Sequence, residues 1–285
     1  MSVMIREGDC IDVLKTFADQ SVHCVVTSPP YWKARNYGGG AEELGAEREP
    51  MAFVARLLLV FDEVRRVLRD DGTCWVNLGD TMHCGSLAGI PWSFASAMSL
   101  SAPGYARRWF LRSAAPWIKR SPMPEAVTNR PSNGLEYFFL FTKKATGYHY
   151  DADAVRLPVC PSTLARDQYT RISAGKDGPY AVRHDHETPS NPKGRNRRNT
   201  DWWMESLGYV VASASYGGNH YAVMPPKLVE PAISAGCPAG GVVLDPFMGT
   251  GTTLEVAVSL GRSAIGIELN PDYVRLAEER MAACA

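Results

Sequence analysis

Residues 242–253 decide the fold of this chain, and they read Val-Val-Leu-Asp-Pro-Phe-Met-Gly-Thr-Gly-Thr-Thr. The apolar run from Val242 to Leu244 predicts a buried strand. A turn with glycines at 249 and 251 follows, and the residues from Thr252 to Leu260 predict a helix. Glycines in a strand-to-helix turn let the backbone approach a ligand closely, so this stretch indicates a nucleoside site in an α/β fold.

A second strand and helix complete this carboxyl-terminal unit. The pattern predicts a strand at Ala264 to Ile267 and a helix at Pro271 to Ala283. Glu268 ends the second strand, 19 residues after Gly249, where nucleotide-binding folds place a carboxylate that accepts ribose hydroxyls. A tight strand-to-helix turn also favours glycine on structural grounds, so the glycines alone do not decide for a ligand.

The amino-terminal part also predicts a strand that delivers a loop. Cys24 to Thr27 form an apolar run that ends in Ser28-Pro29-Pro30-Tyr31-Trp32, so we expect a buried strand with a rigid loop at its carboxyl end. Apolar residues at three- and four-residue intervals from Phe53 to Leu68 predict a helix that Asp70-Asp71-Gly72 stops.

An insertion separates the two parts. Further strands are predicted at Thr73 to Leu78 and at Tyr137 to Phe141, after which Pro, Gly, Asn and Arg dominate from about Asp151 to Gly218.

From these predicted strands and helices we expect an α/β, Rossmann-like fold with a mostly parallel central sheet. Its predicted divisions are residues 1–150, the inserted region 151–218 and residues 219–285.

Composition and charge bound the functional classes. Of the 285 residues, 45% are apolar and 21% charged, as in a soluble globular protein, and the formal net charge is zero. The charge is uneven, because nine Lys or Arg stand against four Asp or Glu between Arg156 and Thr200, where a polyanion would bind. The longest apolar stretch, Phe53 to Phe61, is interrupted by Arg56 and is shorter than the roughly 20 residues of a membrane span.

Cysteine usage indicates reduced thiols. The seven cysteines form no Cys-x-x-Cys pair, have no metal-ligand spacing with the six histidines and follow no signal peptide. We therefore expect a cytoplasmic protein with no metal site and no membrane segment.

Asp245 narrows the kind of ligand. A carboxylate fixed at the strand tip would repel the pyrophosphate of a dinucleotide and would favour a cofactor with a cationic amino-acid end. S-adenosylmethionine carries an ammonium and a sulfonium and has no phosphate, so it fits this site.

Two motifs resemble those of the amino DNA methyltransferases. Residues 245–253 resemble the cofactor loop of that family, Asp-Pro-Phe-x-Gly-x-Gly-Thr-Thr, and residues 27–32 resemble its Asp/Asn/Ser-Pro-Pro-Tyr/Phe loop. The catalytic loop comes first and the cofactor loop last, which resembles the circularly permuted β class. The whole chain resembles orphan, prophage-type members with a Thr-Ser-Pro-Pro-Tyr-Trp loop. The resemblance implies S-adenosylmethionine as cofactor, double-stranded DNA as partner, a homodimer and a bacterial or prophage origin.

The resemblance also implies which residues hold the cofactor. Asp245, Phe247, Gly249 and Gly251 would surround the methionine part. Glu268 would take the ribose hydroxyls, and Gly8-Asp9-Cys10 would reach the adenine edge. The segment from His220 to Leu228 more loosely resembles the part that closes over the methionine. A helix cap for Asp9 and core packing for Phe247 are the alternative roles. The implied cofactor-binding residues are Asp9, Cys10, Lys227, Asp245, Pro246, Phe247, Gly249, Thr250, Gly251, Thr252 and Glu268.

Ser28, Pro29, Pro30 and Tyr31 are the predicted catalytic group. A base amino group is a poor nucleophile because its lone pair is delocalised into the ring, so acceptors must draw it toward tetrahedral geometry. The prolines cannot donate, which leaves backbone carbonyls and the Ser28 hydroxyl as acceptors, and Tyr31 offers a face for an extruded base. Methyl transfer would be a direct displacement. Methylation at cytosine C5 is disfavoured, because that family needs a cysteine after a proline and none occurs here.

Basic stretches predict the DNA contacts. Residues 193–199 combine charge for phosphates with side chains that can read purine edges, and they lie where the family keeps its target recognition region. A short charge run is otherwise most often a solvated loop. The predicted DNA-binding residues are Trp32, Lys119, Arg130, Lys193, Arg195, Asn196, Arg197 and Arg198.

Several functions stay open at the level of sequence. Ser28 favours cytosine N4 as the target within the family at large, whereas the likeness to prophage-type members favours adenine N6. We expect adenine N6 to be the target, with cytosine N4 as the alternative. More distant alternatives are methylation of RNA or of a protein amide, and a non-catalytic nucleic-acid-binding protein that has kept a nucleoside pocket.

Overall fold

One mixed sheet organises the chain. The computed structural model describes residues 1–33, 43–99, 109–119, 126–156 and 224–284. Seven strands of these residues form a sheet in the order β1-β9-β8-β2-β3-β7-β6. The first five strands in this order are parallel, and β7 is antiparallel to both of its neighbours, so the expected mostly parallel α/β sheet is confirmed. The strands are β1 (Val3–Glu7), β2 (Val22–Thr27), β3 (Leu68–Gly79), β6 (Phe110–Ile118), β7 (Leu135–Thr142), β8 (Val242–Asp245) and β9 (Ser263–Glu268).

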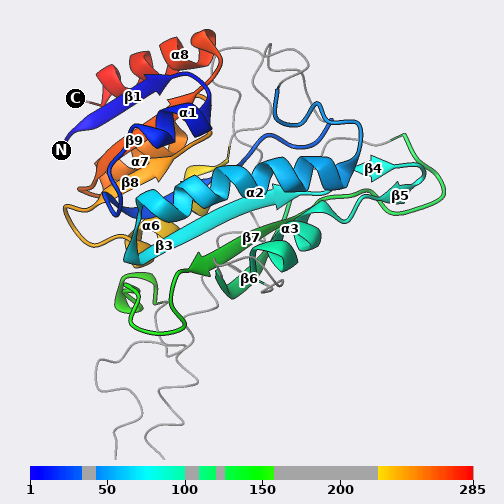
Figure 1. Cartoon of the computed structure of the whole chain (residues 1–285), viewed down its shortest axis with the longest axis horizontal. Helices are drawn as coiled ribbons and strands as arrows, with labels where there is room; N and C mark the ends of the chain where they lie inside the picture. Colours follow the sequence, from blue (N-terminus) through cyan, green and yellow to red (C-terminus); the bar gives the residue numbers. More distant parts are fainter. Residues whose placement is uncertain (34–42, 100–108, 120–125, 157–223, 285) are drawn as a thin grey trace, which may run out of the picture.

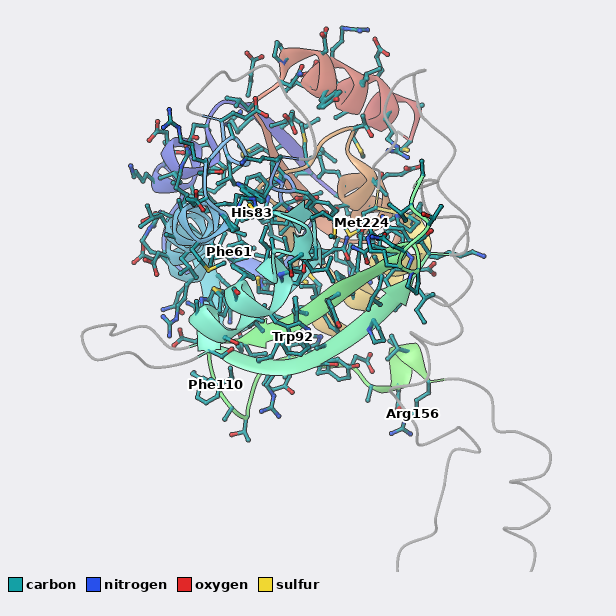
Figure 2. All side chains as sticks on the ribbon, turned by 90° about the vertical axis from the view of Figure 1, so that its right-hand side faces the viewer. Phe61, His83, Trp92, Phe110, Arg156 and Met224 are labelled. Atoms are coloured by element: carbon teal, nitrogen blue, oxygen red, sulfur yellow. The ribbon has the colours of Figure 1, made fainter. Side chains whose placement is uncertain are left out.

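Helices cover both faces of the sheet (Figure 1). The helices of one face are α1 (Cys10–Lys15), α2 (Pro50–Val67) and α3 (Ile90–Ser99), and those of the other are α6 (Pro226–Gly236), α7 (Thr252–Ser259) and α8 (Pro271–Ala283). Successive strand residues point to opposite faces, so Val25 packs with the α2 layer and Val26 with the α6 layer. Figure 2 shows Phe61 and Met224 in these two cores. The chain is therefore a three-layer α/β/α structure.

The α2–β3 junction differs from its predicted boundaries. The helix ends at Val67 and the strand begins at Leu68, five residues before the predicted Thr73. Val22 pairs with Leu68 and Cys24 with Thr73, so residues 69–72 form a bulge in β3. A Cβ on Gly72 would lie 2.8 Å from the backbone carbonyl oxygen of His23, so this bulge requires glycine.

Several elements were not predicted from the sequence. They are β1, α1, α3, β6, α6, a small hairpin of β4 (Met82–His83) and β5 (Ser86–Leu87), and a 3-10 turn, η2 (Asp153–Val155). The predicted insertion lies outside the described residues, except for residues 151–156, which contain η2.

The strand order explains where a ligand can bind. β2 and β8 are parallel neighbours, with Val25 paired to Leu244, although they lie at opposite ends of the chain. After β2 the chain crosses through α2 to β3, and after β8 it crosses through α7 to β9 on the opposite face. Crossovers that leave in opposite directions open a crevice at the carboxyl ends of the two strands. The two predicted loops begin at these ends.

Candidate active site

Glycine conformations shape the loop after β8. Gly249 and Gly251 have φ of 53° and 83°, a region that residues with a side chain rarely adopt. Gly251 directly precedes α7, and a Cβ there would lie 3.2 Å from Ala277 Cβ of α8. The glycines therefore serve both the turn and the close approach of α8.

Asp245 connects this loop to the catalytic loop. Its side chain is 3% exposed, and its Oδ1 accepts hydrogen bonds from Thr27 Oγ1 at 2.6 Å and from the Phe247 N–H at 3.1 Å. Burial raises the pKa of the Asp245 carboxyl to about 6, although these hydrogen bonds act in the opposite direction. A buried carboxylate of this kind is best stabilised by a nearby cation.

Glu268 lies at the end of the neighbouring strand β9. One carboxylate oxygen accepts from the Gly249 N–H at 3.0 Å, and the other accepts from the Asn270 N–H at 2.8 Å. Burial raises the pKa of the Glu268 carboxyl. These bonds fix the carboxylate beside the loop while leaving lone pairs that can accept ligand hydroxyls.

The loop after β1 reaches the same place, because the Gly8 N–H donates to the Glu268 carbonyl at 2.9 Å. Asp9 caps α1, with Oδ1 accepting from the Ile11 N–H at 2.8 Å and from the Asp12 N–H at 3.2 Å. Burial raises the pKa of the Cys10 thiol to about 12, so it stays protonated and neutral. The alternative role of Asp9 as a helix cap is present in the structure, and both residues also line the pocket.

A pocket of about 990 Å³, counted out to the solvent at its mouth, lies at these loops. It is lined by these predicted residues: Asp9, Cys10, Ser28, Pro30, Asp245, Pro246, Phe247, Gly249, Thr250, Thr252 and Glu268. Phe247 also packs against the core under α2, so its alternative role applies as well.

Other lining residues were not predicted, among them Glu43, Leu44, Thr253, Ile267 and Tyr273. Ile267 and Thr253 directly flank predicted positions in the sequence, which was the available signal. Glu43 is only 6% exposed, and nothing in its local pattern marks it as a pocket residue. Tyr273 also has no local sequence signal, because only the tertiary fold brings its helix α8 to this pocket.

Two predicted cofactor residues do not line the pocket. Lys227 lies exposed in the first turn of α6, so its role in cofactor binding stays a prediction. Gly251 acts through the turn geometry described above. Residues 220–223 of the looser motif lie outside the described residues, whereas Met224 lines the pocket.

The pocket fits S-adenosylmethionine by the chemistry of its walls. Two desolvated carboxylates, Asp245 and Glu268, favour cationic and hydroxyl groups. The hydroxyl of Thr250 is buried without a hydrogen-bond partner among the described residues, so a polar ligand group can satisfy it. Phe247 and Ile267 provide apolar surface for a nucleoside.

The catalytic loop rests on residues 43–49. The Lys33 N–H donates to the Gly45 carbonyl at 2.8 Å, and Trp32 Nε1 donates to the Glu47 carbonyl at 2.8 Å. Ser28 and Pro30 line the pocket, whereas Pro29 is buried and Tyr31 points to a polar cluster on β3 and β7. The loop therefore presents Ser28 and Pro30 to the ligand from a rigid support.

The predicted DNA contacts need one correction. Trp32 is 1% exposed and packs edge-on against His83, so it is a core residue in this structure and cannot contact DNA. Lys119 pairs with Glu136, and Arg130 donates to the Pro131 carbonyl at 3.2 Å. The other predicted residues, Lys193, Arg195, Asn196, Arg197 and Arg198, lie outside the described residues.

The sequence matches the N6/N4 family described as DNA methylase over residues 22–279. This chain belongs to that family of DNA amino methyltransferases. It is similar to the type II methyltransferase M.XycI of Xanthomonas campestris pv. cyanopsidis, with 35% identity over 96% of this chain and 86% of the relative.

Two solved structures share the fold of this methyltransferase. The cytosine-N4-specific PvuII DNA methyltransferase gives a TM-score of 0.61 at 19% identity, covering 100% of this chain and 91% of that one. A DNA modification methylase of Thermus thermophilus, in complex with S-adenosyl-L-methionine, gives a TM-score of 0.57 at 24% identity, covering 99% and 93%. At these identities the likeness concerns the fold alone.

No helix within the described ranges is long and apolar enough to cross a membrane. In that same part of the chain, no group of three or more His, Cys, Asp or Glu side chains could hold a metal ion.

Proposed function

We propose that this methyltransferase transfers the methyl group of S-adenosylmethionine to the exocyclic amino group of an extruded base in double-stranded DNA. One observation carries the proposal: Ser28 and Pro30 line the same pocket as Asp245 and Glu268. The hydrogen bond from Thr27 to Asp245 fixes the two loops against each other. Nucleophile and methyl donor can therefore be held next to each other.

The residues of the chain act by orienting the cofactor and the base amino group. Asp245 faces the cationic amino-acid end of the cofactor, and Glu268 accepts from its ribose. The Ser28 hydroxyl and the carbonyls of the proline loop accept hydrogen bonds from the base amino group, which turns its lone pair toward the methyl carbon. The bound cofactor supplies a methyl group on a positively charged sulfur. The nitrogen–carbon bond forms as the carbon–sulfur bond breaks, and the amino proton then leaves to water.

The target base has two candidates. Adenine N6 is the prediction from the likeness to prophage-type members. Cytosine N4 is favoured by Ser28, which lines the pocket at the first position of the catalytic loop. Both bases present the same conjugated amino group, and the family name covers both atoms.

Three further assignments belong to this proposal. Residues 151–218 form the target recognition region between a catalytic part, residues 1–150, and a cofactor-binding part, residues 219–285. The arginines and lysines of residues 151–218 contact DNA. The protein acts as a homodimer, and light scattering with and without DNA tests that assignment.

A methyl-transfer assay tests the proposal. Labelled S-adenosylmethionine is offered with duplex DNA, with RNA or with a protein mixture, and we expect label in duplex DNA only. Ser28→Ala should lose transfer by about 100-fold or more while its affinity for the cofactor stays within a few-fold of wild type. Transfer to RNA or protein in place of DNA, or no turnover on any DNA, would contradict the proposal.

A further inference from the structure

A polar cluster holds Tyr31 from outside the pocket. The Tyr31 hydroxyl donates to Glu136 Oε2 at 2.5 Å and accepts from Asn77 Nδ2 at 2.8 Å. Asn77 Nδ2 also donates to Glu136 Oε2 at 2.7 Å, and Lys119 forms an ion pair with Glu136 Oε1. These four residues, Tyr31, Asn77, Lys119 and Glu136, are called the Tyr31 cluster below.

The cluster joins a loop residue to rigid strands. Asn77 belongs to β3 and Glu136 to the adjacent β7, while Lys119 directly follows β6. Tyr31 alone comes from the catalytic loop, 105 residues away from Glu136. The strands therefore fix the position of the tyrosine ring rather than the reverse.

Glu136 is a buried charge that is paired with a partly exposed one. The Glu136 side chain is 6% exposed and that of Lys119 is 35% exposed, and the ammonium also lies 5.1 Å from the centroid of the Trp117 ring. Removing Lys119 would leave the Glu136 carboxylate desolvated and without its ion-pair partner. Lys119 thus has a partner within the protein, and this ion pair explains the charge of Lys119 without a DNA contact.

Gly79 leaves the space that the Tyr31 ring occupies. A Cβ on Gly79 would lie 2.8 Å from Tyr31 Cε2 and 3.2 Å from Glu136 Cγ. Only glycine at this position lets the ring and the carboxylate meet.

The Tyr31 cluster contains a buried polar atom that lowers the stability of the fold. Asn77 is 1% exposed, and its Oδ1 has no hydrogen-bond partner among the described residues. An unpaired buried acceptor lowers stability, whereas an apolar side chain in its place would not. Polar groups that are kept at such a cost often serve the arrangement of a site.

We propose that Glu136 is a positioning residue for methyl transfer, which holds the Tyr31 ring in its stacking position before DNA arrives, with Asn77 and Lys119 as its supports. This inference rests on the proposed function, in which the Tyr31 ring packs against the extruded base. A ring fixed in advance loses no rotational freedom when the base enters. Loss of the hydroxyl contact should therefore slow the transfer step and leave cofactor binding unchanged.

The test is a double-mutant cycle of single-turnover methyl transfer at saturating DNA and cofactor. Tyr31→Phe keeps the ring and removes the hydroxyl, and Glu136→Gln removes the charge that the hydroxyl faces. We expect each variant to be slower by about tenfold, and the double variant to be no slower than either single one. Tyr137→Phe, which removes a tyrosine hydroxyl from the next residue of β7, is the matched control and should equal wild type.

The outcomes separate the two proposals. If wild type transfers methyl groups to DNA but Tyr31→Phe and Glu136→Gln react at the wild-type rate, the positioning role is wrong and the proposed function stands. Additive losses in the double variant would also overturn the positioning role, because the two groups would then act separately. If wild type shows no transfer to any DNA, the proposed function itself fails. Far-ultraviolet circular dichroism and the cofactor-induced shift in Tm check that each variant is folded.

Discussion

At the scale of single residues, Asp245 shows how the site balances stability against binding. Burial raises its pKa to about 6 from an ordinary value of 3.8. Its contribution to the stability of the cofactor-free protein is therefore complete below about pH 4 and is lost as the pH rises through about 6. At neutral pH the ionised carboxylate is destabilising until a cation binds next to it.

We expect Asp245→Asn to separate these two effects. The amide keeps an oxygen that can accept from Thr27 and Phe247 but carries no charge. At pH 8 the cofactor-free variant should be as stable as wild type or more stable, by up to about 1–3 kcal/mol, and the difference should shrink at pH 5. Urea unfolding at the two pH values measures this.

Cofactor binding provides the second half of that experiment. S-adenosylmethionine should raise the Tm of wild type and should barely change the Tm of Asp245→Asn, because the variant offers no charge to the cationic end. Wild-type affinity, measured by calorimetry, should also increase as the pH rises through about 6. An equal Tm shift in both proteins would show that Asp245 does not face the cofactor.

At the scale of elements, the bond from Thr27 to Asp245 joins the ends of β2 and β8. Thr27→Val removes this buried donor with little change in shape. The free energy of unfolding should fall by about 1–3 kcal/mol, and by more at pH 8 than at pH 5, because an ionised acceptor loses more.

Thr142→Val is the control for this substitution. Thr142 is equally buried, but its hydroxyl donates to the neutral carbonyl of Lys144 at 2.7 Å, far along the sheet on β7. Its loss of stability should be the same at both pH values, and cofactor affinity should not change. A pH-independent loss in Thr27→Val as well would contradict the proposed coupling.

Gly251 tests the packing of the cofactor turn against α8. Gly251→Ala introduces strain at a φ of 83° and a contact at 3.2 Å with Ala277. Gly240→Ala is the matched variant, since its φ is 71° and its Cβ would meet nothing within 4 Å. Both should lose about 1 kcal/mol or more of stability through strain, and Gly251→Ala should lose more and bind the cofactor more weakly. Equal effects would show that α8 does not constrain the turn.

The elements flanking both motifs could be predicted from sequence, because apolar runs such as Val242 to Leu244 stop at glycine or proline. β6 could not, since Arg112 and Pro116 interrupt its pattern, and α1 has only six residues. Trp32 was misjudged because an aromatic side chain beside a catalytic loop suits both a core and a DNA surface. The contact of Tyr31 with Glu136 depends on strand order, which no local pattern contains.

At the scale of the whole molecule, the topology brings together loops that begin 218 residues apart at Thr27 and Asp245. The crossovers after β2 and β8 lie on opposite faces of the sheet (Figure 1), and the pocket is lined by residues that follow these two strands. The local sequence could supply the two motifs and their order, but their meeting is a property of the sheet.

Binding of DNA belongs to this scale as well. Replacing Arg195, Arg197 and Arg198 together by Ala should weaken binding to all duplexes and lower the slope of log affinity against log salt by about 0.9 for each lost phosphate contact. Fluorescence anisotropy at several salt concentrations measures the slope. An unchanged slope would mean that these arginines contact no phosphates.

The most direct test of the central claim is mass spectrometry of nucleosides from duplex DNA that the protein has modified with S-adenosylmethionine. We expect a methyl group on an exocyclic amino nitrogen, as N6-methyladenosine or N4-methylcytidine in their deoxy forms. The first product would support the adenine prediction, and the second would replace it with cytosine N4. 5-Methyldeoxycytidine, or no methylated nucleoside from any duplex, would show that the protein is not an amino methyltransferase of DNA.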